Sequence, residues 1–142
     1  MIQKTQKTDL ANLTLLGSGR NSKARPSKRL EVFPNKSANA YLVELFTDEF
    51  TCLCPATGQP DFAKIKISYV PKNLIVESKS LKLYLWSFRN EGCFHEHLTN
   101  VILDDLCAVL DPVWCKVEGD FNVRGGIGIK VSAQKGERPA NV

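Results

Sequence analysis

The sequence lacks the segments that would place it in a membrane or outside the cell. None of its apolar runs approaches the ~20 residues that a transmembrane helix needs. The first 17 residues contain no apolar core followed by a small-residue cleavage site, as a signal peptide would. The five cysteines are an odd number, which argues against a disulfide framework. We therefore expect a cytoplasmic protein with no membrane partner.

Two other patterns are missing. No G-x-G-x-x-G motif follows a predicted strand, so a Rossmann cofactor site is not indicated. The basic N-terminal part is also poor in aromatic residues: residues 1–36 carry a net charge of +6, and Phe33 is the only aromatic among them. Binding of single-stranded nucleic acid usually combines positive charge with stacked aromatics. A non-enzymatic RNA-binding module stays an alternative, but we expect no nucleic acid partner.

The length and composition that remain are those of one globular domain. The chain has 142 residues, of which 43% are hydrophobic and 24% charged. Gly, Ser, Pro and charged residues dominate residues 17–39, which is typical of a linker or a surface loop. We expect residues 1–39 to form a basic arm and loop, and residues 40–142 a single folded domain.

Hydrophobic periodicity predicts two strands, two helices and two further strands. The segment 40–54 is typical of a strand running into a loop, and residues 62–70 alternate, with Ala63, Ile65, Ile67 and Tyr69 on one face. A helical stripe follows at Leu81, Tyr84, Leu85 and Phe88, with Gly92 as the expected end of that helix. A second helix is expected from about Phe94 to Pro112, with its apolar face at Leu98, Val101, Ile102, Leu106, Val109 and Leu110. Strands are expected in 114–124 and 126–133; in the second, Ile127, Ile129 and Val131 alternate with smaller or polar residues.

The β-β-α-α-β-β order indicates an α+β fold. Two hairpins around a helix pair favour a four-stranded antiparallel sheet with both helices on one face. Such a sheet has two open edges, which native proteins rarely leave unpaired. Pairing edge to edge with copies of itself would close a barrel, so we expect a homo-oligomer.

The segment FTCLCPATGQPDF contains the first candidate for chemistry. Cys54 precedes Pro55, and the two prolines and Gly58 of this segment fix a tight turn. Asp61 follows seven residues after Cys54, so the loop can bring carboxyl and thiol together. A thiol with a nearby acid or base is the minimum for covalent catalysis. The alternative is an inert thiol and a turn carboxylate.

Two further clusters can bind ligands. The segment 77–84 (ESKSLKLY) opens the first helix with Ser78 as its expected N-cap, and the free N–H groups there can bind phosphate with Lys79, Ser80 and Lys82 beside them. Arg124 offers another cation beside the flexible Gly125-Gly126 turn. The second cluster is the segment 93–97 (CFHEH) at the start of the second helix. In it, Glu96 can accept hydrogen bonds from a guanine-like ring, and His95 can donate to a ring oxygen or a developing anion.

Zinc is a competing interpretation of the thiols and imidazoles. Cys52, Cys54, Cys93, His95 and His97 could together hold the metal, although their spacings differ from the usual structural sites. Cys107 and Cys115 lie in apolar patterns and are expected in the core.

Three blocks of this sequence, in family order, carry a resemblance to a known family. The blocks FTCLCPATGQPDFA, ESKSLKLY and FHEHLTN make the chain resemble the NADPH-dependent 7-cyano-7-deazaguanine reductases, the nitrile reductases of queuosine biosynthesis, over residues 40–133. These enzymes share the tunnelling fold, in which β-β-α-α-β-β units pair into barrels. The resemblance therefore implies a single tunnelling-fold catalytic domain in residues 40–142, and active sites that lie between subunits.

The resemblance also implies roles for individual residues. Cys54 would be the nucleophile that forms a covalent thioimide with the nitrile, and Asp61 the proton donor. The substrate contacts would be Val76, Glu77, Ser78, His95 and Glu96. Lys79, Ser80, Lys82 and Arg124 would contact the NADPH, with two NADPH used per product. The resemblance implies no metal and an incidental Cys52; the alternative within the same fold is a zinc-dependent pterin or GTP cyclohydrolase.

Overall fold

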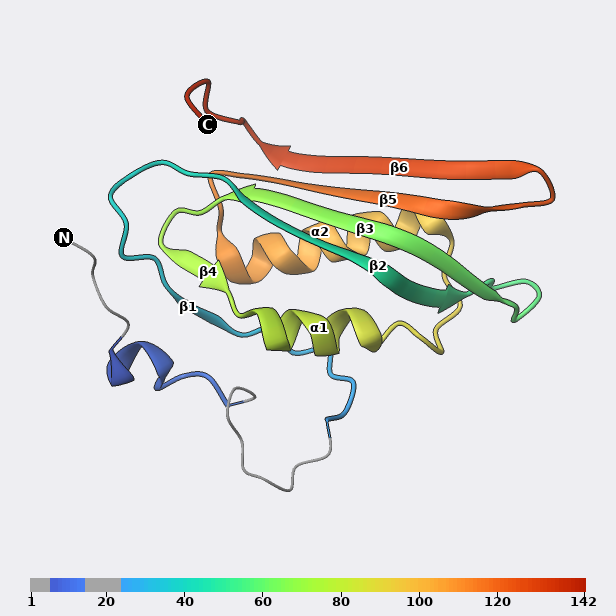
Figure 1. The fold of residues 1–142 in the computed structure, drawn as a ribbon, viewed down its shortest axis with the longest axis horizontal. Coiled ribbons are helices and arrows are strands. Elements are labelled where there is room, and N and C mark those ends of the chain that lie inside the picture. The colour runs from blue at the N-terminus through green and yellow to red at the C-terminus, as the bar shows by residue number, and fades with distance from the viewer. Residues whose placement is uncertain (1–5, 15–23) are drawn as a thin grey trace.

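The computed structural model describes residues 6–14 and 24–142, and all statements below concern these residues. Figure 1 shows a sheet of four long strands with two helices on one of its faces. In chain order the elements are the short 3-10 turn η1 (Lys7–Leu10), β1 (Val32–Pro34), β2 (Val43–Leu53), β3 (Pro60–Val70), β4 (Leu74–Val76), α1 (Ser78–Trp86), α2 (His95–Leu110), β5 (Trp114–Arg124) and β6 (Ile127–Gly136). The α+β fold and the four-stranded antiparallel sheet predicted from the sequence are confirmed.

The large sheet has the strand order β2-β3-β5-β6, with every neighbouring pair antiparallel. The central strand β3 alternates as the sequence predicted, because Ala63, Ile65, Ile67 and Tyr69 are all buried. Strands β2 and β6 form the two edges of the sheet. The face opposite the helices is open (Figure 1), and Phe62, Lys64 and Lys66 of β3 are exposed on it.

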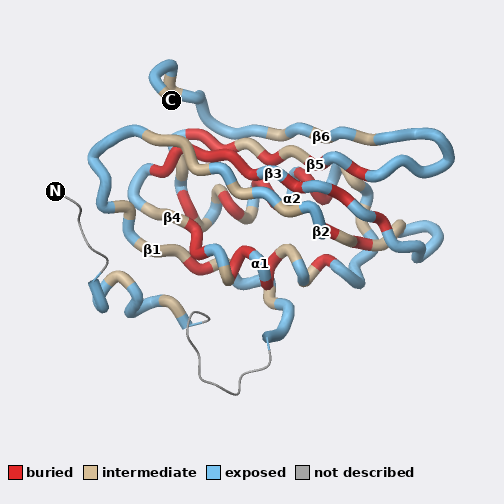
Figure 2. Tube along the Cα trace, in the orientation of Figure 1, coloured by how far each residue is buried: buried red, intermediate tan, exposed pale blue. Residues whose placement is uncertain are grey.

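The two helices cover one face of the sheet (Figure 1), and buried parts of the strands and helices lie between the two layers (Figure 2). Helix α2 contacts β5 and β6, while α1 lies beside β2. Leu81, Tyr84 and Phe88 of the predicted stripe are buried, as expected. Leu85 is only half-buried, and Leu83 is buried although the prediction did not include it.

Helix α1 ends at Trp86, so the expected end at Gly92 is wrong. The Ser87 hydroxyl donates a hydrogen bond to the Tyr84 carbonyl at 2.5 Å, within the last turn. Beyond that turn the chain pairs with the end of β2: the Leu53 N–H donates to the Glu91 carbonyl and the Cys93 N–H donates to the Leu53 carbonyl. A tertiary contact therefore ends the helix, which no local pattern could show.

The buried face of α2 differs from the prediction at Val101 and Leu103, and the predicted Val109 is only half-buried. Val101 is 41% exposed, and Leu103 is buried instead. Because α2 contacts β5 and β6 and also reaches β4, its buried face is rotated toward Leu103. Cys115 is buried and Cys107 half-buried, so only Cys115 is a full member of the core.

Part of the expected surface loop forms a strand that the sequence analysis missed. Val32–Pro34 pairs with β4 in a small two-stranded sheet beside α1. The Glu77 N–H donates to the Glu31 carbonyl and the Glu31 N–H donates to the Ser80 hydroxyl, so this segment is bonded to the start of α1. The boundary at residue 39 stays a prediction.

Candidate active site

The loop between β2 and β3 holds the thiol of Cys54 in a tight turn. The Gly58 N–H donates to the Cys54 carbonyl at 2.9 Å, and the Cys54 N–H donates to the Gln59 carbonyl at 2.8 Å. Gly58 has a φ of +69°, a conformation that glycine adopts without strain. Four hydrogen-bond donors act on Sγ: the turn supplies the Thr57 hydroxyl and the backbone N–H groups of Thr57 and Ala56, and the end of β5 supplies the Arg124 guanidinium.

These donors stabilise the thiolate of Cys54. They lower its pKa from the ordinary value of 9.0 to about 6, with the Thr57 hydroxyl as the largest cause and Arg124 next. The side chain is partly exposed, so it is accessible as well as ionised at neutral pH. A thiolate in this condition is the form that attacks an electrophile.

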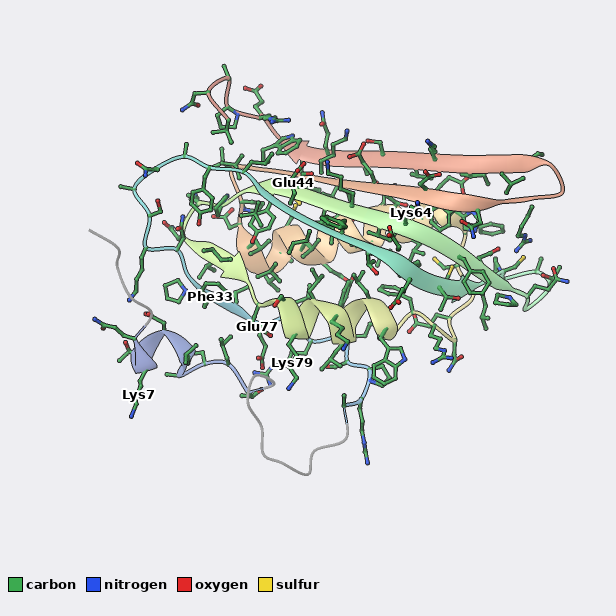
Figure 3. All side chains as sticks on the ribbon, viewed as in Figure 1. Lys7, Phe33, Glu44, Lys64, Glu77 and Lys79 are labelled. Carbon is green, nitrogen blue, oxygen red and sulfur yellow. The ribbon has the colours of Figure 1, made fainter. Side chains whose placement is uncertain are left out.

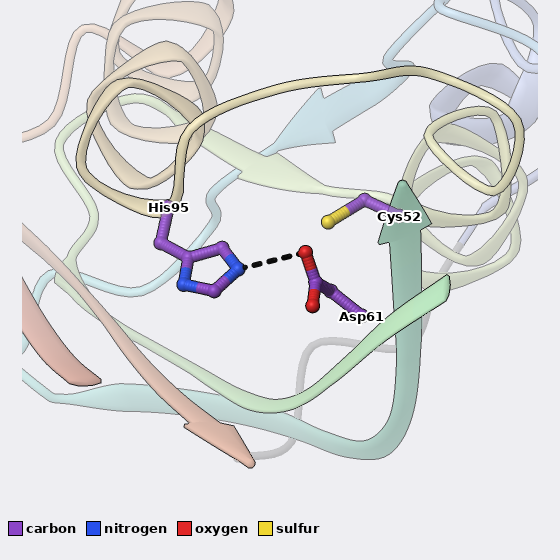
Figure 4. Close-up of side chains that lie close together, drawn as sticks. All are labelled: Cys52, Asp61 and His95. Carbon is purple, nitrogen blue, oxygen red and sulfur yellow. Dashed lines mark ion pairs between the residues drawn. The ribbon is translucent and has the colours of Figure 1, made fainter. Parts of the chain in front are cut away.

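Asp61 lies at the start of β3 and is 4% exposed. Its two carboxylate oxygens have different partners: Arg124 Nη1 contacts Oδ1, and His95 Nε2 lies 3.1 Å from Oδ2 (Figure 4). The Thr51 hydroxyl donates to the Asp61 carbonyl at 2.8 Å, which fixes the backbone. Asp61 is thus held between a cation and an imidazole beside the Cys54 loop.

His95 is the first residue of α2, and its ring is held in place by an aromatic residue of β5. The rings of His95 and Phe121 are stacked, with centroids 3.8 Å apart and planes 8° from parallel. The preceding loop also fixes this position, since a Cβ on Gly92 would lie 3.1 Å from the Pro55 Cα. The loop that carries Cys54 and the loop that leads into α2 are therefore in close contact.

Cys52 lies beside this group but in a different environment. It is the register partner of Asp61 across the β2–β3 pair and is fully buried. Burial raises its pKa to about 11, and the Asp61 charge acts in the same direction. The thiol that the resemblance marked as incidental is therefore protonated and inaccessible.

The predicted zinc set does not come together in the described part of the chain. The potential metal ligands that do lie within 4.8 Å of one another are Cys52, Asp61 and His95 (Figure 4). Cys54, Cys93 and His97 are not in this group. The carboxylate of Asp61 already faces the Arg124 cation, which competes with any metal ion there.

Glu77 is the N-cap of α1, which corrects the expectation that Ser78 takes this position. Its carboxylate accepts hydrogen bonds from the N–H groups of Lys79 at 2.8 Å and Ser80 at 2.7 Å. The side chain is 5% exposed and lies at the start of α1, where Figure 3 labels it. A carboxylate has about four lone-pair sites, so Glu77 can still accept from a ligand.

The same contacts correct the expectation of a phosphate site at this helix start. The N–H groups that were to bind phosphate are occupied by Glu77. The Ser80 hydroxyl is fully buried, donates to the Glu77 carbonyl at 2.7 Å and accepts from the Glu31 N–H at 3.0 Å. Lys79 and Lys82 remain available as cations on α1, the latter exposed.

The other predicted substrate residues differ in exposure. Val76 is buried and its N–H donates to the Tyr69 hydroxyl at 3.2 Å. Ser78 and Glu96 are exposed, at the starts of α1 and α2 respectively. Glu96 therefore faces solvent beside the Asp61–His95 pair.

The predicted site residues form two groups in one chain. Cys54, Asp61, His95 and Arg124 gather at the end of the sheet where β2 meets β3 and β5 meets β6. Glu77 and Lys79 lie at the N-terminal end of α1, which is the end away from that corner (Figures 1 and 3). A helix of nine residues is roughly 14 Å long, so one chain does not bring both groups onto one small substrate.

A cavity of about 600 Å³ runs between β2 and α1. Its walls combine apolar residues of both elements with three larger side chains of the helix and the following loop, Lys82, Trp86 and Arg89. The cavity reaches from Ser78 to Thr51, and Thr51 contacts the backbone of Asp61. It thus lies along the path between the two groups.

Sequence reasoning missed two residues of this site. Thr57 is the largest cause of the lowered pKa of Cys54, and Phe121 stacks on His95. The C-P-A-T-G turn places Thr57 close to Cys54 in sequence, so the contact between them could have been predicted. The sequence contains no comparable signal for Phe121, because it is an ordinary core position of an alternating strand.

Comparisons with known proteins agree with this site. The family model described as QueF-like protein matches residues 60–140. A relative from Syntrophus aciditrophicus (strain SB), named NADPH-dependent 7-cyano-7-deazaguanine reductase, is 58% identical over 135 residues, covering 94% of each chain. A protein of the same name from Anaeromyxobacter sp. (strain K) is 59% identical over 119 residues, covering 83% of this chain and 98% of its own.

Solved structures give the same result for the fold. The crystal structure of the archaeosine synthase QueF-Like in the apo form matches with a TM-score of 0.63 and 26% identity, over 69% of this chain and 96% of that one. The α+β fold, the Cys54 loop and these relatives lead to one conclusion. The chain belongs to the QueF-like family, among the NADPH-dependent 7-cyano-7-deazaguanine reductases.

Proposed function

We propose that this chain reduces the nitrile of 7-cyano-7-deazaguanine to the aminomethyl group of 7-aminomethyl-7-deazaguanine, a step of queuosine biosynthesis, with two NADPH per product. Its relatives from Syntrophus and Anaeromyxobacter carry the name of this reductase. The observation that carries the proposal for this chain is the Cys54 thiolate, with a pKa of about 6, beside the buried Asp61.

The thiolate and the carboxyl group divide the first step between them. A nitrile carbon is electrophilic, and Cys54 Sγ forms a bond to it as one C–N π bond breaks. The nitrogen gains that electron pair and takes a proton from Asp61, leaving a covalent thioimide and a carboxylate. Arg124 and His95, which contact the two carboxyl oxygens of Asp61, would stabilise the carboxylate that this step leaves.

The residues on α1 fit an anionic cofactor. Lys79 and Lys82 present cations along the helix, and Lys82 lines the cavity beside β2 with Trp86 and Arg89. The cavity of about 600 Å³ is lined mostly by apolar residues, and the cations Lys82 and Arg89 in its wall can bind a phosphate of a dinucleotide. When bound, NADPH would supply the hydrides that take the carbon from nitrile to amine. The whole reduction needs two hydrides and two protons, and the proton from Asp61 is one of the two.

We infer that the active site is completed by a second copy of the chain. Glu77, Ser78 and Val76 would meet the substrate from one subunit, and Cys54, Asp61, His95 and Glu96 from its neighbour. The two groups lie apart in one chain, and β2 and β6 are open edges to which a copy can bond. We expect the substrate and a homo-oligomer as partners, without nucleic acid.

Intact-mass measurement tests the covalent step directly. The protein is mixed with 7-cyano-7-deazaguanine in the absence of NADPH, and we expect a mass increase equal to the whole nitrile, because addition expels no group. The adduct should be absent from Cys54→Ala and retained in Cys52→Ala, a control that removes the buried thiol two residues before Cys54. Addition of NADPH should then consume two equivalents per product formed.

Two outcomes would contradict the proposal. A wild-type protein that forms no adduct excludes the thioimide step. Zinc bound at one ion per chain and lost in a Cys52→Ala or His95→Ala variant would favour the cyclohydrolase alternative.

Location in the cytoplasm stays a prediction; among the described residues, no helix is long and apolar enough to cross a membrane.

A further inference from the structure

Arg124 is placed by the hairpin that joins β5 and β6. It is the last residue of β5, and the turn Gly125-Gly126 has φ angles of +57° and +82°, as a tight two-residue hairpin requires. The register between β5 and β6 shifts between Phe121 and Arg124, which indicates a bulge. A bulge redirects the side chains that follow it, and here the following side chain lies over the Cys54 loop.

The guanidinium of Arg124 contacts both reacting groups of the site. Its Nη1 forms an ion pair with Asp61 Oδ1, and the guanidinium also donates to the thiolate of Cys54. These two contacts raise the pKa of Arg124, with Cys54 as the larger cause. Asp61 is 63 residues away in sequence, so tertiary folding alone makes this arrangement.

A residue that is occupied in this way is poorly suited to bind a cofactor phosphate. A phosphate on Arg124 would compete with the Asp61 carboxylate, which is nearly buried and would lose its cation. Lys79 and Lys82 lie on α1 rather than at the hairpin, away from this carboxylate, so a phosphate bound there displaces no such partner.

We propose that Arg124 is a positioning residue of the catalytic centre, whose single guanidinium holds the Cys54 thiolate and the carboxyl group of Asp61 together, rather than a ligand of the cofactor phosphates. The inference takes from the proposed function only that Cys54 is the nucleophile.

The planar fork of arginine explains why one side chain can serve two anions. Its five N–H donors point in fixed directions, so one edge can face the carboxylate while another faces the sulfur. When Sγ bonds to a nitrile carbon its negative charge is lost, and the Asp61 carboxylate formed in that step becomes the sole anion on the guanidinium. Arg124 therefore stabilises the site both before and after the addition.

The test measures the reactivity of Cys54 without substrate or cofactor. The rate of Cys54 alkylation by iodoacetamide is followed against pH by peptide mass spectrometry in wild type, Arg124→Ala, Arg124→Lys and Lys130→Ala. Lys130 is the matched control, a cation of the same hairpin that pairs with Asp120. Circular dichroism confirms that each variant is folded.

We expect the alkylation midpoint to rise by about one pKa unit in Arg124→Ala, which means roughly tenfold slower alkylation at pH 5. Arg124→Lys should recover part of this loss, because an ammonium keeps the charge but lacks the fork. Lys130→Ala should match the wild type. The KM for NADPH should change less than kcat in Arg124→Ala.

An unchanged midpoint in Arg124→Ala together with a raised KM for NADPH would overturn the inference and assign Arg124 to the cofactor. If Arg124→Ala does not fold, the midpoint of Arg124→Lys decides: identity with the wild type overturns the inference as well. A wild type that forms no nitrile adduct but shows the Arg124-dependent midpoint would refute the proposed function; it would leave the stabilisation of the Cys54 thiolate by Arg124 standing and remove its role in the nitrile addition.

Discussion

Cys52 and Cys54 are two residues apart and differ by about five pKa units, since their pKa values are about 11 and about 6. Residue type is identical, so environment makes the difference. Cys52 is buried beside the Asp61 carboxylate, which disfavours a thiolate. Cys54 lies in a turn whose donors, Thr57 first and Arg124 next, bind the thiolate form.

This contrast predicts a selective pH profile for the native protein. Because the pKa of Cys54 is lowered, its thiolate persists down to about pH 6 and is lost as the pH falls further. Alkylation of Cys54 should therefore reach half its maximal rate near pH 6. Cys52 and Cys115, whose pKa values are raised by burial, should stay unmodified until the chain is unfolded in urea. Equal labelling of Cys52 and Cys54 in the native state would contradict this prediction.

Glu77 gives a second prediction at the residue scale. Replacement by alanine removes two hydrogen bonds at the start of α1, so the free energy of unfolding should fall by about 1–2 kcal/mol. Urea denaturation measures the change. The control is Lys82→Ala, at an exposed position of the same helix. Its free energy of unfolding should stay within about 0.5 kcal/mol of that of the wild type, while its KM for NADPH should rise. A Glu77→Ala variant as stable as the wild type would show that the cap contributes nothing.

Strand β5 connects helix packing to the active site. Gly119 lies where α2 approaches the sheet most closely: a Cβ there would meet the Phe121 ring at 2.6 Å and the Thr99 hydroxyl at 3.1 Å. Phe121 in turn stacks on His95, and Arg124 ends the strand. One strand therefore sets the positions of the imidazole and the guanidinium that hold Asp61.

A substitution on β5 tests this connection. Gly119→Ala should displace the Phe121 ring, lower the free energy of unfolding by about 1–3 kcal/mol and reduce kcat through His95. The alkylation midpoint of Cys54 should change little, since Thr57 and Arg124 set it. Gly128→Ala on β6 is the control, because its new Cβ would meet only the exposed Val123 side chain, at 3.3 Å. A variant with unchanged kcat would separate the packing of β5 from catalysis.

At the scale of the whole molecule, the four-stranded sheet has two edges, β2 and β6, that pair with no further strand of the described residues. Several large apolar side chains are exposed on its strands, led by Phe46 at 79%, with Phe62, Val123 and Ile127. Apolar residues gathered on exposed strands mark an interaction surface. Assembly through these edges would also bring together the two groups of site residues.

Complementation between inactive variants tests whether the site is shared. Cys54→Ala and Glu77→Gln should each be inactive alone. Subunits that exchange or are co-expressed should recover roughly a quarter of the wild-type activity, because in a random mixture one interface in four combines an intact Cys54 with an intact Glu77. The measurement is NADPH consumption by the mixed oligomer. A mixture as inactive as its components would place both residues in the same chain's site.

Much of the fold followed from periodic patterns in the sequence. The alternation of β3 and the stripe of α1 report which face of each element is buried, and both were confirmed in the structure, except that Leu85 of the stripe is only half-buried. The short strand β1 was missed, since three residues are too few to show a period. The end of α1 was misplaced because pairing of Glu91 and Cys93 with Leu53 sets it.

The sequence by itself determined the order of elements, the tight turn at Cys54 and the closeness of Asp61, because all three are local: they depend on periodicity, on Pro and Gly, and on seven residues of chain. It also placed a cation at Arg124 without showing its use. Only the tertiary structure decided that Glu77 caps α1, that Phe121 stacks on His95, and that Arg124 contacts Cys54 and Asp61. These contacts join residues far apart in sequence, and the charge state of a thiol depends on every donor and charge around it in space.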